Sequence, residues 1–215
     1  MSTDIGHGRG STKVIDICIF SRNRPLQLHG LLCSIKDKVS HYGEITILYR
    51  YDDEYLPALT EIKGQFQECK FIEDDNFKDQ VCKFLGQGSD FCFFLVDDII
   101  FRKAIDLRLC ENILSHNPNI LTFSLRLGLH LNYCYPMQQS QKIPNGQVQQ
   151  DLFVWDWTSA DHDWGYPFSV DGHVFRKEQF LGWCRHLEFC NPNSYESELQ
   201  KITHTFLVPD VCITG

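Results

Sequence analysis

The sequence predicts an α/β fold, with a central, mostly parallel mixed sheet of about six strands flanked by helices. The first observation is that strand-like apolar segments alternate with segments of helical periodicity four times. The second is that charged residues follow the first four strand-like segments. In a parallel sheet such residues meet at one edge, where α/β proteins bind ligands.

The individual elements follow from hydrophobic period and turn residues. Val14 to Phe20 is short, β-branched and bounded by polar residues, as a buried strand should be. Pro57 opens one helical segment near its first turn, and Asn76 is placed to cap another, with Gly86 or Gly88 as its stop. The predicted strands are 14–20, 45–53, 69–75, 90–98 and 120–126. The predicted helices are 26–39, 56–66, 76–88, one between the last two strands, 176–189 and 194–202.

The chain changes character at about residue 127, where loop-forming, aromatic and acidic residues replace the alternating pattern. There is no internal repeat and no low-complexity block in the sequence. We therefore predict one domain over residues 14–215, whose part 127–215 packs on the same core as 14–126. Residues 1–13 are polar and rich in Gly, and we predict a loose tail there.

Charge and hydropathy exclude several classes of partner. The net charge is -8, and no basic stripe of the kind that binds nucleic acid or anionic lipid is present. No apolar run approaches the roughly 20 residues of a membrane span. The N-terminus lacks the apolar region of a signal peptide, so we expect a cytoplasmic protein.

The ten cysteines form no C-x-x-C pair, and most lie beside apolar residues, as Cys18, Cys92 and Cys212 do. Zinc sites and disulfide frameworks both need spacing patterns that are absent here. We predict buried free thiols that act as small hydrophobic residues in a reducing compartment.

The segment FFLVDDIIF, residues 93–101, contains two adjacent carboxylates in an apolar run. A pair of carboxylates at a strand end suits a hard divalent cation such as Mg²⁺ or Mn²⁺. The alternative is a solvated strand end, or one Asp that caps the next helix. The acids and cations at the other strand ends favour a cation site at Asp97 and Asp98.

Basic and acidic residues follow the other strands. Arg22 and Arg24 offer two guanidinium groups for a planar or anionic ligand, or they pair with surface acids. Asp52 or Asp53 is placed to accept from a base or ribose, or is solvated in its loop. Lys78 lies one turn into a helix, where it reaches a phosphate or stays on the surface.

The segment WDWTSADHDWGYPFSVDGHVF, residues 155–175, combines Trp, Asp and His. Aromatic faces beside carboxylates suit carbohydrate, whereas the alternative is a set of core aromatics with solvated acids. His173 is a candidate metal ligand or a half-buried structural His. Glu196 is a candidate general base, or an acid that favours the start of a helix.

The motifs SRNRP, VDD, FSLRLG, YPFSVDGHVFR and NPNSYESEL, in this order, resemble GT-A-fold nucleotide-sugar glycosyltransferases. The likeness covers nearly the whole chain after residue 13, and is closest to small bacterial and chlorella-virus domains. It implies the N-terminal glycosyltransferase domain of a larger viral protein that builds capsid glycan. The protein would then act in the host cytoplasm, and further domains would follow in the longer chain.

The resemblance also implies roles for single residues. The family's D-x-D motif falls on Val96, Asp97 and Asp98, so that Val replaces its first acid. Asp98 is then the first metal ligand, Asp97 assists through ribose or a metal-bound water, and His173 adds a ligand. The metal is Mn²⁺ or Mg²⁺, and the donor is a UDP-sugar.

The remaining implied roles divide the domain into a nucleotide-binding half, 14–126, and an acceptor-binding half, 127–215. Arg126 faces the donor pyrophosphate or sugar, and Glu196 or one of three Asp faces the acceptor hydroxyl of a glycan or glycoprotein. The implied nucleotide-binding residues are Phe20, Ser21, Arg22, Arg24, Asp52, Lys78, Val96 and Asp97. The three alternative acids are Asp156, Asp161 and Asp163. Whether the reaction inverts or retains stays open.

Two rival functions share some of these features. A sugar-phosphate nucleotidyltransferase has the same α/β plan and acidic strand ends. It usually carries a Gly-rich phosphate loop after the first strand, whereas SRNRPLQL contains no Gly. A non-catalytic carbohydrate-binding module explains the aromatic residues, but it does not explain four acidic or basic strand ends.

Overall fold

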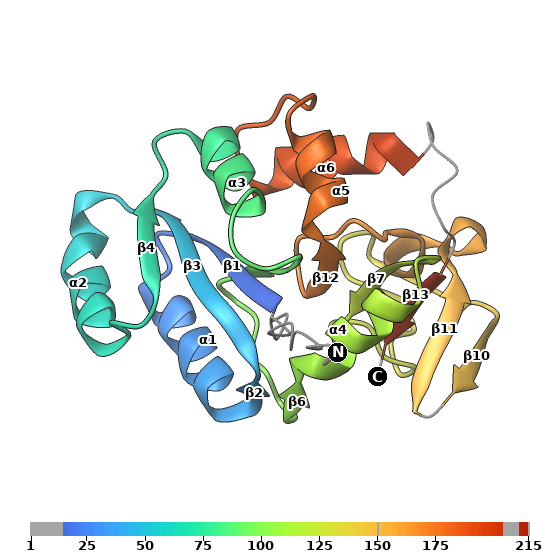
Figure 1. Cartoon of the computed structure of the whole chain (residues 1–215). Helices are drawn as coiled ribbons and strands as arrows, with labels where there is room; N and C mark the ends of the chain where they lie inside the picture. The colour runs from blue at the N-terminus through green and yellow to red at the C-terminus, as the bar shows by residue number, and fades with distance from the viewer. Residues whose placement is uncertain (1–14, 150, 204–210, 215) are drawn as a thin grey trace, which may run out of the picture.

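The computed structural model describes residues 15–149, 151–203 and 211–214 (Figure 1). The predicted tail 1–13 lies outside the described residues. The strands are β1 Ile15–Arg22, β2 Val39–Ser40, β3 Tyr42–Arg50, β4 Lys70–Glu73, β5 Phe91–Val96, β6 Ile105–Asp106, β7 Ile120–Ser124, β8 Tyr133–Cys134, β9 Gln139–Ser140, β10 Gly146–Gln149, β11 Leu152–Asp156, β12 His173–Arg176 and β13 Val211–Thr214. The helices are α1 Pro25–Lys38, α2 Leu56–Gln65, α3 Phe77–Leu85, α4 Leu107–His116, α5 Lys177–Cys184 and α6 Pro192–Thr203. Three short 3-10 helices are η1 Asp53–Tyr55, η2 Trp157–Ser159 and η3 His162–Gly165.

The predicted α/β class and the mixed sheet flanked by helices are confirmed. Nine of the described strands form one sheet in the order β10-β11-β13-β7-β12-β5-β1-β3-β4. The run β5-β1-β3-β4 is parallel throughout, as the alternating pattern predicts. The other end of the sheet is mixed, because β12 and β11 run antiparallel to their neighbours while β13 pairs parallel with β7. The sheet thus has more strands than the about six expected.

Strand β12 lies between two strands that the chain makes much earlier. His173 is in register with Phe94 of β5 and also with Ser124 of β7. The backbone of Gly172 donates to Phe94 O at 2.9 Å and accepts from Leu125 N at 2.8 Å, which ties both neighbours to the start of β12. Gly172 has φ 81°, and a Cβ there would lie 3.0 Å from Arg126 Cβ. The glycine therefore lets the segment that follows β7 pass close to β12.

Alternating side chains of the central strands build two apolar layers. Along β1, Ile15, Ile17 and Ile19 belong to a core that includes residues of α1, α2 and α4. Cys18 and Phe20 belong to a second core, together with residues of α3, α5 and α6. This period of two places the helices on opposite faces of the sheet, and Figure 1 shows α1 and α4 on one side and α3, α5 and α6 on the other.

A buried ion pair joins β1 to α5. Lys177, at the start of α5, donates through Nζ to Asp16 Oδ2 on β1 at 2.7 Å and to Gln87 O at 2.7 Å. The Asp16 and Lys177 residues are 5% and 3% exposed. Burial alone would raise the pKa of Asp16, but the bonds from Lys177 and Ser89 lower it below its usual value. Gly88, with φ 74°, leaves room for this pair, because a Cβ there would lie 2.2 Å from Asp16 Oδ2.

The cysteine prediction is wrong for one pair. Cys82 of α3 and Cys184 of α5 form a disulfide, although 102 residues separate them in the sequence. Both helices pack on the same face of the sheet, which brings the two thiols together without any local spacing signal. Five other cysteines are free and buried, as predicted, whereas Cys33 and Cys190 are free and exposed. The side chain of Cys212 lies outside the described residues.

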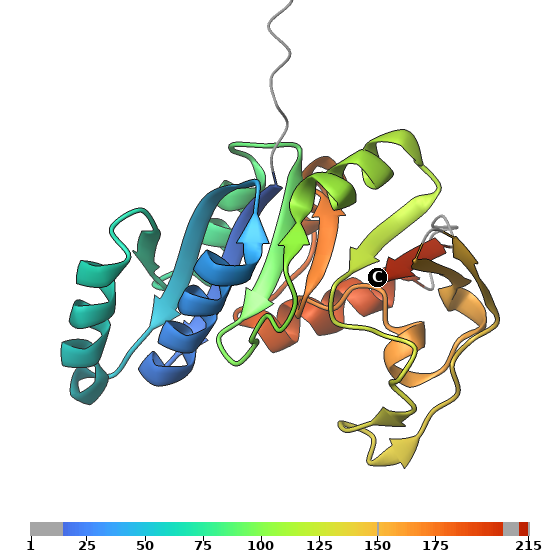
Figure 2. The same cartoon turned by 90° about the horizontal axis from the view of Figure 1, so that it is seen from below.

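Two pairs of short strands lie outside the nine-stranded sheet. The β8–β9 hairpin, drawn in yellow, projects away from the main sheet in Figure 2. Strands β2 and β6 form a separate parallel pair. Within the described ranges, no helix has both the length and the apolar character that a membrane span requires.

Candidate active site

The ends of β1, β3 and β5 bring the predicted polar residues together at one edge of the sheet. The Ser21 hydroxyl, at the end of β1, donates to Asp97 Oδ2 beyond β5 at 2.9 Å. The same hydroxyl lies 2.7 Å from the Tyr51 hydroxyl beyond β3. We call this group the strand-end site. It comprises Ser21, Arg22, Asn23, Arg24, Tyr51, Asp52, Asp97 and Asp98.

The fourth strand end also reaches this edge. Asp74 N, after β4, donates to Tyr49 O at 2.7 Å. Burial raises the pKa of Asp74, and the positive charges of nearby Arg50 and Arg22 oppose this rise. The acids and cations predicted after the four parallel strands therefore lie along one edge, as parallel strand ends require.

Asp97 holds the strand-end site together from the inside. Its residue is 4% exposed, and its Oδ2 accepts from Ser21 Oγ and from Arg22 N at 3.3 Å. Burial raises the pKa of Asp97, and these two hydrogen bonds counteract part of that rise. The carboxylate thus fixes the turn after β1, where Asn23 takes a left-handed φ of 54°.

Asp98 faces outward beside Arg24. The Asp98 side chain is 54% exposed, and its Oδ2 accepts from Arg24 Nη1 at 2.9 Å. The same nitrogen lies 3.5 Å from Asp97 Oδ1. The predicted alternative for Arg24, pairing with an acid, is therefore realised, but the acids are those of the strand-end site. Asp98 keeps a solvent-accessible carboxylate where a ligand can approach.

The other residues predicted to hold the nucleotide divide into two groups. Asp52 belongs to the strand-end site, where it accepts from Asn23 Nδ2 at 2.6 Å and donates its N–H to Asn23 Oδ1 at 2.8 Å. Phe20 is 4% exposed in the core, and half-buried Val96 packs against the same core. Lys78 donates to Glu188 at 2.9 Å, so that its ammonium is engaged by a surface acid.

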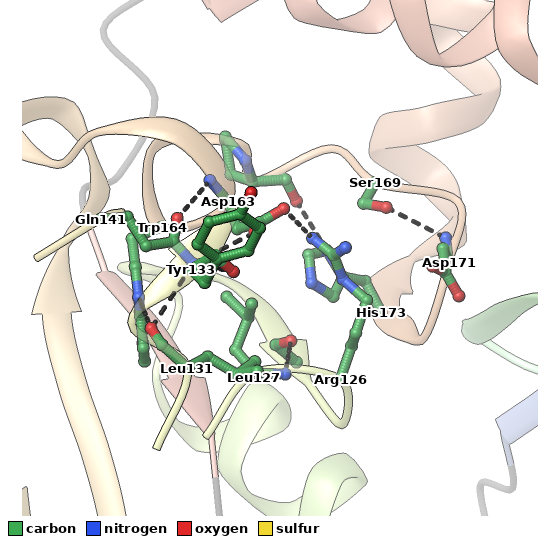
Figure 3. Close-up of polar contacts among 12 residues, drawn as sticks. Arg126, Leu127, Leu131, Tyr133, Gln141, Asp163, Trp164, Ser169, Asp171 and His173 are labelled. Atoms are coloured by element: carbon green, nitrogen blue, oxygen red, sulfur yellow. Dashed lines mark hydrogen bonds and ion pairs between the residues drawn. The ribbon is translucent and has the colours of Figure 1, made fainter. Parts of the chain in front are cut away.

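A second polar group forms beyond the ends of β7 and β12 (Figure 3). Arg126 Nη2 lies 3.3 Å from Asp163 Oδ1, and buried Gln141 donates to Asp163 Oδ2 at 3.1 Å. Asp163 N returns a hydrogen bond to Gln141 Oε1 at 3.1 Å. We call this group the Arg126 cluster. It comprises Arg126, Gln141, Asp163, Tyr166, Asp171, His173 and Glu196.

His173 lies at the base of the Arg126 cluster and is 1% exposed. Its Nδ1 lies 3.2 Å from Pro167 O, and because a carbonyl only accepts, Nδ1 carries the proton. Nε2 then presents a lone pair, and it has no hydrogen-bond partner within the described ranges. Burial, together with the charge of Arg126, lowers the pKa of His173 to about 3, so the ring is neutral at pH 7.

Glu196 and Asp171 complete the Arg126 cluster. Glu196 Oε1 accepts from Val170 N at 3.0 Å. Burial raises the pKa of Tyr166, and the charge of Glu196 and its hydrogen bond with Tyr166 raise that pKa further. Burial raises the pKa of Asp171, whose charge interacts with Arg126 and also with Asp98 of the strand-end site. The two groups therefore adjoin, and their acids and cations act on one region of the molecule.

The predicted metal ligands do not gather into one group. Over the described part of the chain, no three or more His, Cys, Asp or Glu side chains are arranged to hold a metal ion. Asp97 is engaged by Ser21 and Arg22, and Asp98 pairs with Arg24. The ligand roles of Asp97, Asp98 and His173 therefore stay predictions.

The remaining acids and the tryptophans take other roles. Asp156 caps η2 by accepting from Thr158 N at 2.8 Å, and Asp161 is exposed without a side-chain cap bond. The proposed carbohydrate-facing tryptophans are in the core, because Trp155, Trp157 and Trp164 are 2%, 7% and 0% exposed. The alternative of core aromatics is thus correct for these three side chains.

Three residues of these groups had no signal in the sequence. Tyr51 follows a strand as one of several aromatics, Gln141 lies in a Gln-rich loop, and Asp171 is one acid among many. Two cavities, of 360 and 530 Å³, lie toward the other edge of the sheet. Asp16 and Lys70 line the first, and Phe91 and Arg176 line the second.

A sequence comparison relates the chain to a glycosyltransferase. The chain is 24% identical over 182 residues to the bifunctional glycosyltransferase pgtA of Dictyostelium discoideum. The match covers 75% of this chain and 24% of that protein, so the chain spans about a quarter of its relative's length. No protein-family model matches the chain.

Solved structures share the fold. S. aureus TarS 1–349 in complex with UDP has 10% identity and a TM-score of 0.58, covering 94% of this chain and 57% of TarS 1–349. Glucosyl-3-phosphoglycerate synthase from Mycobacterium tuberculosis, in complex with UDP, has 13% identity and a TM-score of 0.53, with coverage of 91% and 67%. A CMP:2-keto-3-deoxy-manno-octonic acid synthetase with CTP has 13% identity and a TM-score of 0.52, with coverage of 94% and 89%. The chain therefore has a GT-A-like fold and a glycosyltransferase-like sequence.

Proposed function

We propose that the chain is a glycosyltransferase that moves a sugar from a UDP-sugar to a hydroxyl of a glycan or glycoprotein, with the help of a divalent cation. The observation that carries this proposal is the meeting of Ser21, Asp97 and Asp98 where the parallel strands end. The related glycosyltransferase and the UDP-bound structures of the same fold support it. The viral source and the capsid glycan stay predictions.

The strand-end site supplies groups suited to a nucleoside diphosphate. The turn after β1 is held by Asp97 and by the reciprocal bonds between Asn23 and Asp52, so its shape is set before a ligand binds. The exposed side chains of Arg22 and Arg24 carry the positive charge that a diphosphate needs. Asp52 lies beside them as an acceptor for ribose or base hydroxyl and amide groups.

The oxygen donors of the strand-end site fit a hard cation. A small divalent ion is often held by one or two carboxylates together with substrate phosphates, so a protein group of three is not required. Exposed Asp98 is the first proposed ligand, with Asp97 and the neutral His173 as the resemblance implies. Mn²⁺ or Mg²⁺, when bound, would neutralise charge on the leaving diphosphate.

The Arg126 cluster is suited to the transfer step. Asp163 and Gln141 fix the Arg126 guanidinium, which then faces developing negative charge without reorganising. The Asp163 oxygens are held by Arg126 and Gln141, whereas the Glu196 carboxylate accepts from Val170 N and interacts with the Tyr166 hydroxyl, both of which are uncharged. We assign the acceptor proton to Glu196 if the reaction inverts, as the resemblance implies, ahead of Asp163, Asp156 and Asp161.

Thermal unfolding with nucleotides tests the proposed function. UDP, GDP and CMP are each titrated with and without Mn²⁺, and the melting temperature is followed. A ligand that binds the folded chain stabilises it by about 2.7 kcal/mol at 100 times its dissociation constant. Stabilisation by UDP that depends on Mn²⁺ supports the proposal, and release of UDP from UDP-sugars then shows catalysis. No response to any nucleotide would refute it.

The variant Asp98→Ala tests the metal assignment. Its exposed carboxylate holds no core residue, so the variant should fold and lose Mn²⁺-dependent UDP stabilisation. Sugar transfer should fall by about 100-fold or more, because metal neutralisation of a diphosphate supplies several kcal/mol. Glu61→Ala, an exposed acid on α2 outside both groups, is the control and should keep the UDP response. Unchanged binding by Asp98→Ala would remove Asp98 from the metal site.

A sugar-phosphate nucleotidyltransferase is the second candidate, because the synthetase with CTP shares the fold over most of its own length. The two functions differ in the nucleotide and in the product. A nucleotidyltransferase should be stabilised by a nucleoside triphosphate and should release pyrophosphate from it. A carbohydrate-binding module should respond to no nucleotide at all.

A further inference from the structure

The β8–β9 hairpin carries the aromatic rings that the tryptophans do not offer. Among the large hydrophobic side chains of the described residues, the exposed aromatic ones are Tyr133, 39% exposed, and Tyr135, 80% exposed. Their ring centroids are 5.1 Å apart in a T-shaped contact. Cys134, between them, is 2% exposed, so the strand turns one side chain inward and two rings outward.

Hydrogen bonds hold this hairpin against the Arg126 cluster. Gln141 N donates to Asn132 O at 2.8 Å, and the Gln141 side chain donates to Tyr133 O at 3.4 Å and to Asp163 at 3.1 Å. Asp163 in turn pairs with Arg126. The tyrosines are therefore fixed relative to the cluster assigned to the transfer step.

Polar groups also lie at the hairpin, where Gln139 is paired with Cys134 on the face opposite to Tyr133. Gln139 Nε2, on β9, lies 3.4 Å from His162 Nδ1, which brings the hairpin next to η3. Asp161, which caps no helix through its side chain, is exposed at the start of η3. The exposed aromatic faces of the hairpin are suited to stacking on C–H groups, and the amide, imidazole and carboxylate groups of β9 and η3 are suited to hydrogen bonds with hydroxyls.

We propose that Tyr133 and Tyr135 form the stacking surface that binds a sugar ring of the acceptor, and so select a carbohydrate acceptor. This inference rests on the proposed glycosyltransferase function, and it names the substrate class and two residues that determine it. The same hairpin carries Met137, which is 59% exposed and has no aromatic ring. Substitution of Met137 therefore distinguishes stacking on a sugar from general apolar docking.

Ligand-observed saturation-transfer NMR with methyl α- and β-glycosides of common hexoses and deoxyhexoses, in the presence of UDP and Mn²⁺, tests the proposal. The wild-type chain should give a signal with at least one glycoside. Tyr135→Ala should weaken its binding about tenfold, and Tyr133→Ala with Tyr135→Ala should abolish the signal. The Phe variants at both positions should retain most of the binding, because they keep the rings. Met137→Ala is the control on the same hairpin and should bind as the wild type does.

The response to UDP, measured on the same proteins, separates the two proposals. All of these variants should keep the Mn²⁺-dependent stabilisation by UDP, since the hairpin contributes no residue to the strand-end site. If UDP does not stabilise the wild type in the presence of Mn²⁺, both the proposed function and this inference are refuted. A preserved UDP response with no glycoside signal, or with a signal that survives the double Ala variant, overturns this inference alone. An equal loss in Met137→Ala, or a dimer that Tyr135→Ala dissociates, also overturns it in favour of protein docking.

Discussion

The strand-end site and the Arg126 cluster satisfy their buried polar groups in different ways. In the strand-end site, Asp97, Ser21 and Tyr51 bond to one another between strand ends. In the Arg126 cluster, buried atoms of Arg126, Asp171 and His173 have no hydrogen-bond partner in the described part of the chain. Buried polar atoms are nearly always paired in native proteins, so each exception needs an explanation.

The comparison shows in which region the protein itself supplies the hydrogen-bond partners of its buried polar groups. Strand ends are fixed by the sheet, so the strand-end site is preformed and its residues support one another. The Arg126 cluster consists largely of loop residues, and it has donors and acceptors that a ligand can satisfy. Under the proposed function, the donor nucleotide would bind to the preformed strand-end site, whereas the sugar and the acceptor would supply hydrogen-bond partners to the Arg126 cluster.

The largest expected effect comes from the buried ion pair between Asp16 of β1 and Lys177 of α5, which lies outside both regions and ties the two parts of the chain together. Lys177→Met leaves Asp16 as a buried charge without its counterion, which should cost about 3–5 kcal/mol in the free energy of unfolding. Denaturation by urea, followed separately by tryptophan fluorescence and circular dichroism, measures it. Coincident transitions show that the halves unfold together, and separate transitions would show that they are independent.

The pH dependence of this effect has a definite sign. The folded-state pKa of Asp16 lies below its ordinary value of 3.8, so its contribution to stability is present above that value. The contribution is lost as the pH falls through the lowered pKa. The difference between the wild type and Lys177→Met should therefore be full at pH 7 and shrink in strong acid. Lys103→Met, an exposed lysine, is the control and should change little at either pH.

The next largest effect is the difference in stability loss between substitutions of the two neighbouring carboxylates, Asp97 and Asp98. Asp97→Ala removes the acceptor of Ser21 Oγ and Arg22 N, and should cost about 2–3 kcal/mol, because the hydrogen bonds go to a charged group. Asp98→Ala removes an exposed ion pair and should change stability by less than about 1 kcal/mol. Equal losses in chemical denaturation would contradict the view that Asp97 supports the site and Asp98 serves the ligand.

The smallest effect has the opposite sign. Asp171→Asn removes a buried carboxylate that has an unpartnered oxygen and lies near the negative charges of Asp98, Asp163 and Glu196. At pH 7 the variant should gain about 1 kcal/mol, which is a rise of about 2–4 °C in melting temperature for a chain of this length. Sugar transfer should fall at the same time. Asp161→Asn, at an exposed position, should leave the melting temperature unchanged, and a less stable Asp171→Asn protein would show that the cluster is already complete.

The parallel part of the fold could be predicted from the sequence because its signals are local. Apolar runs, Pro57 and the cap Asn76 lie within the elements they define, and Asn76 accepts from Asp79 N as predicted. Strand β12 had no such signal, because HVFR is short and lies in a segment rich in aromatics and acids. Its place in the sheet depends on contacts with β5 and β7, which only tertiary packing decides.

The candidate site divides in the same way. Parallel strand ends must share an edge, so Ser21, Asp52 and Asp97 could be placed together without a structure. Gln141 and Asp171 join the Arg126 cluster through loops, whose course no periodicity determines. For the tryptophans, the sequence suggested a site that the structure does not form. Aromatic and acidic residues together suit carbohydrate, but the three rings are buried in the core.

The position of β12 has a consequence for how the chain is made. A ribosome that has released residues 1–126 has produced β5 and β7, but not the strand that lies between them. The nascent chain then carries an open edge on β5, with the backbone groups of Phe93 and Phe94 unpaired on that side. Open apolar edges recruit other chains, so the newborn protein depends on its own later residues to cover this one. A gene fragment that stops at residue 126 would keep that edge permanently.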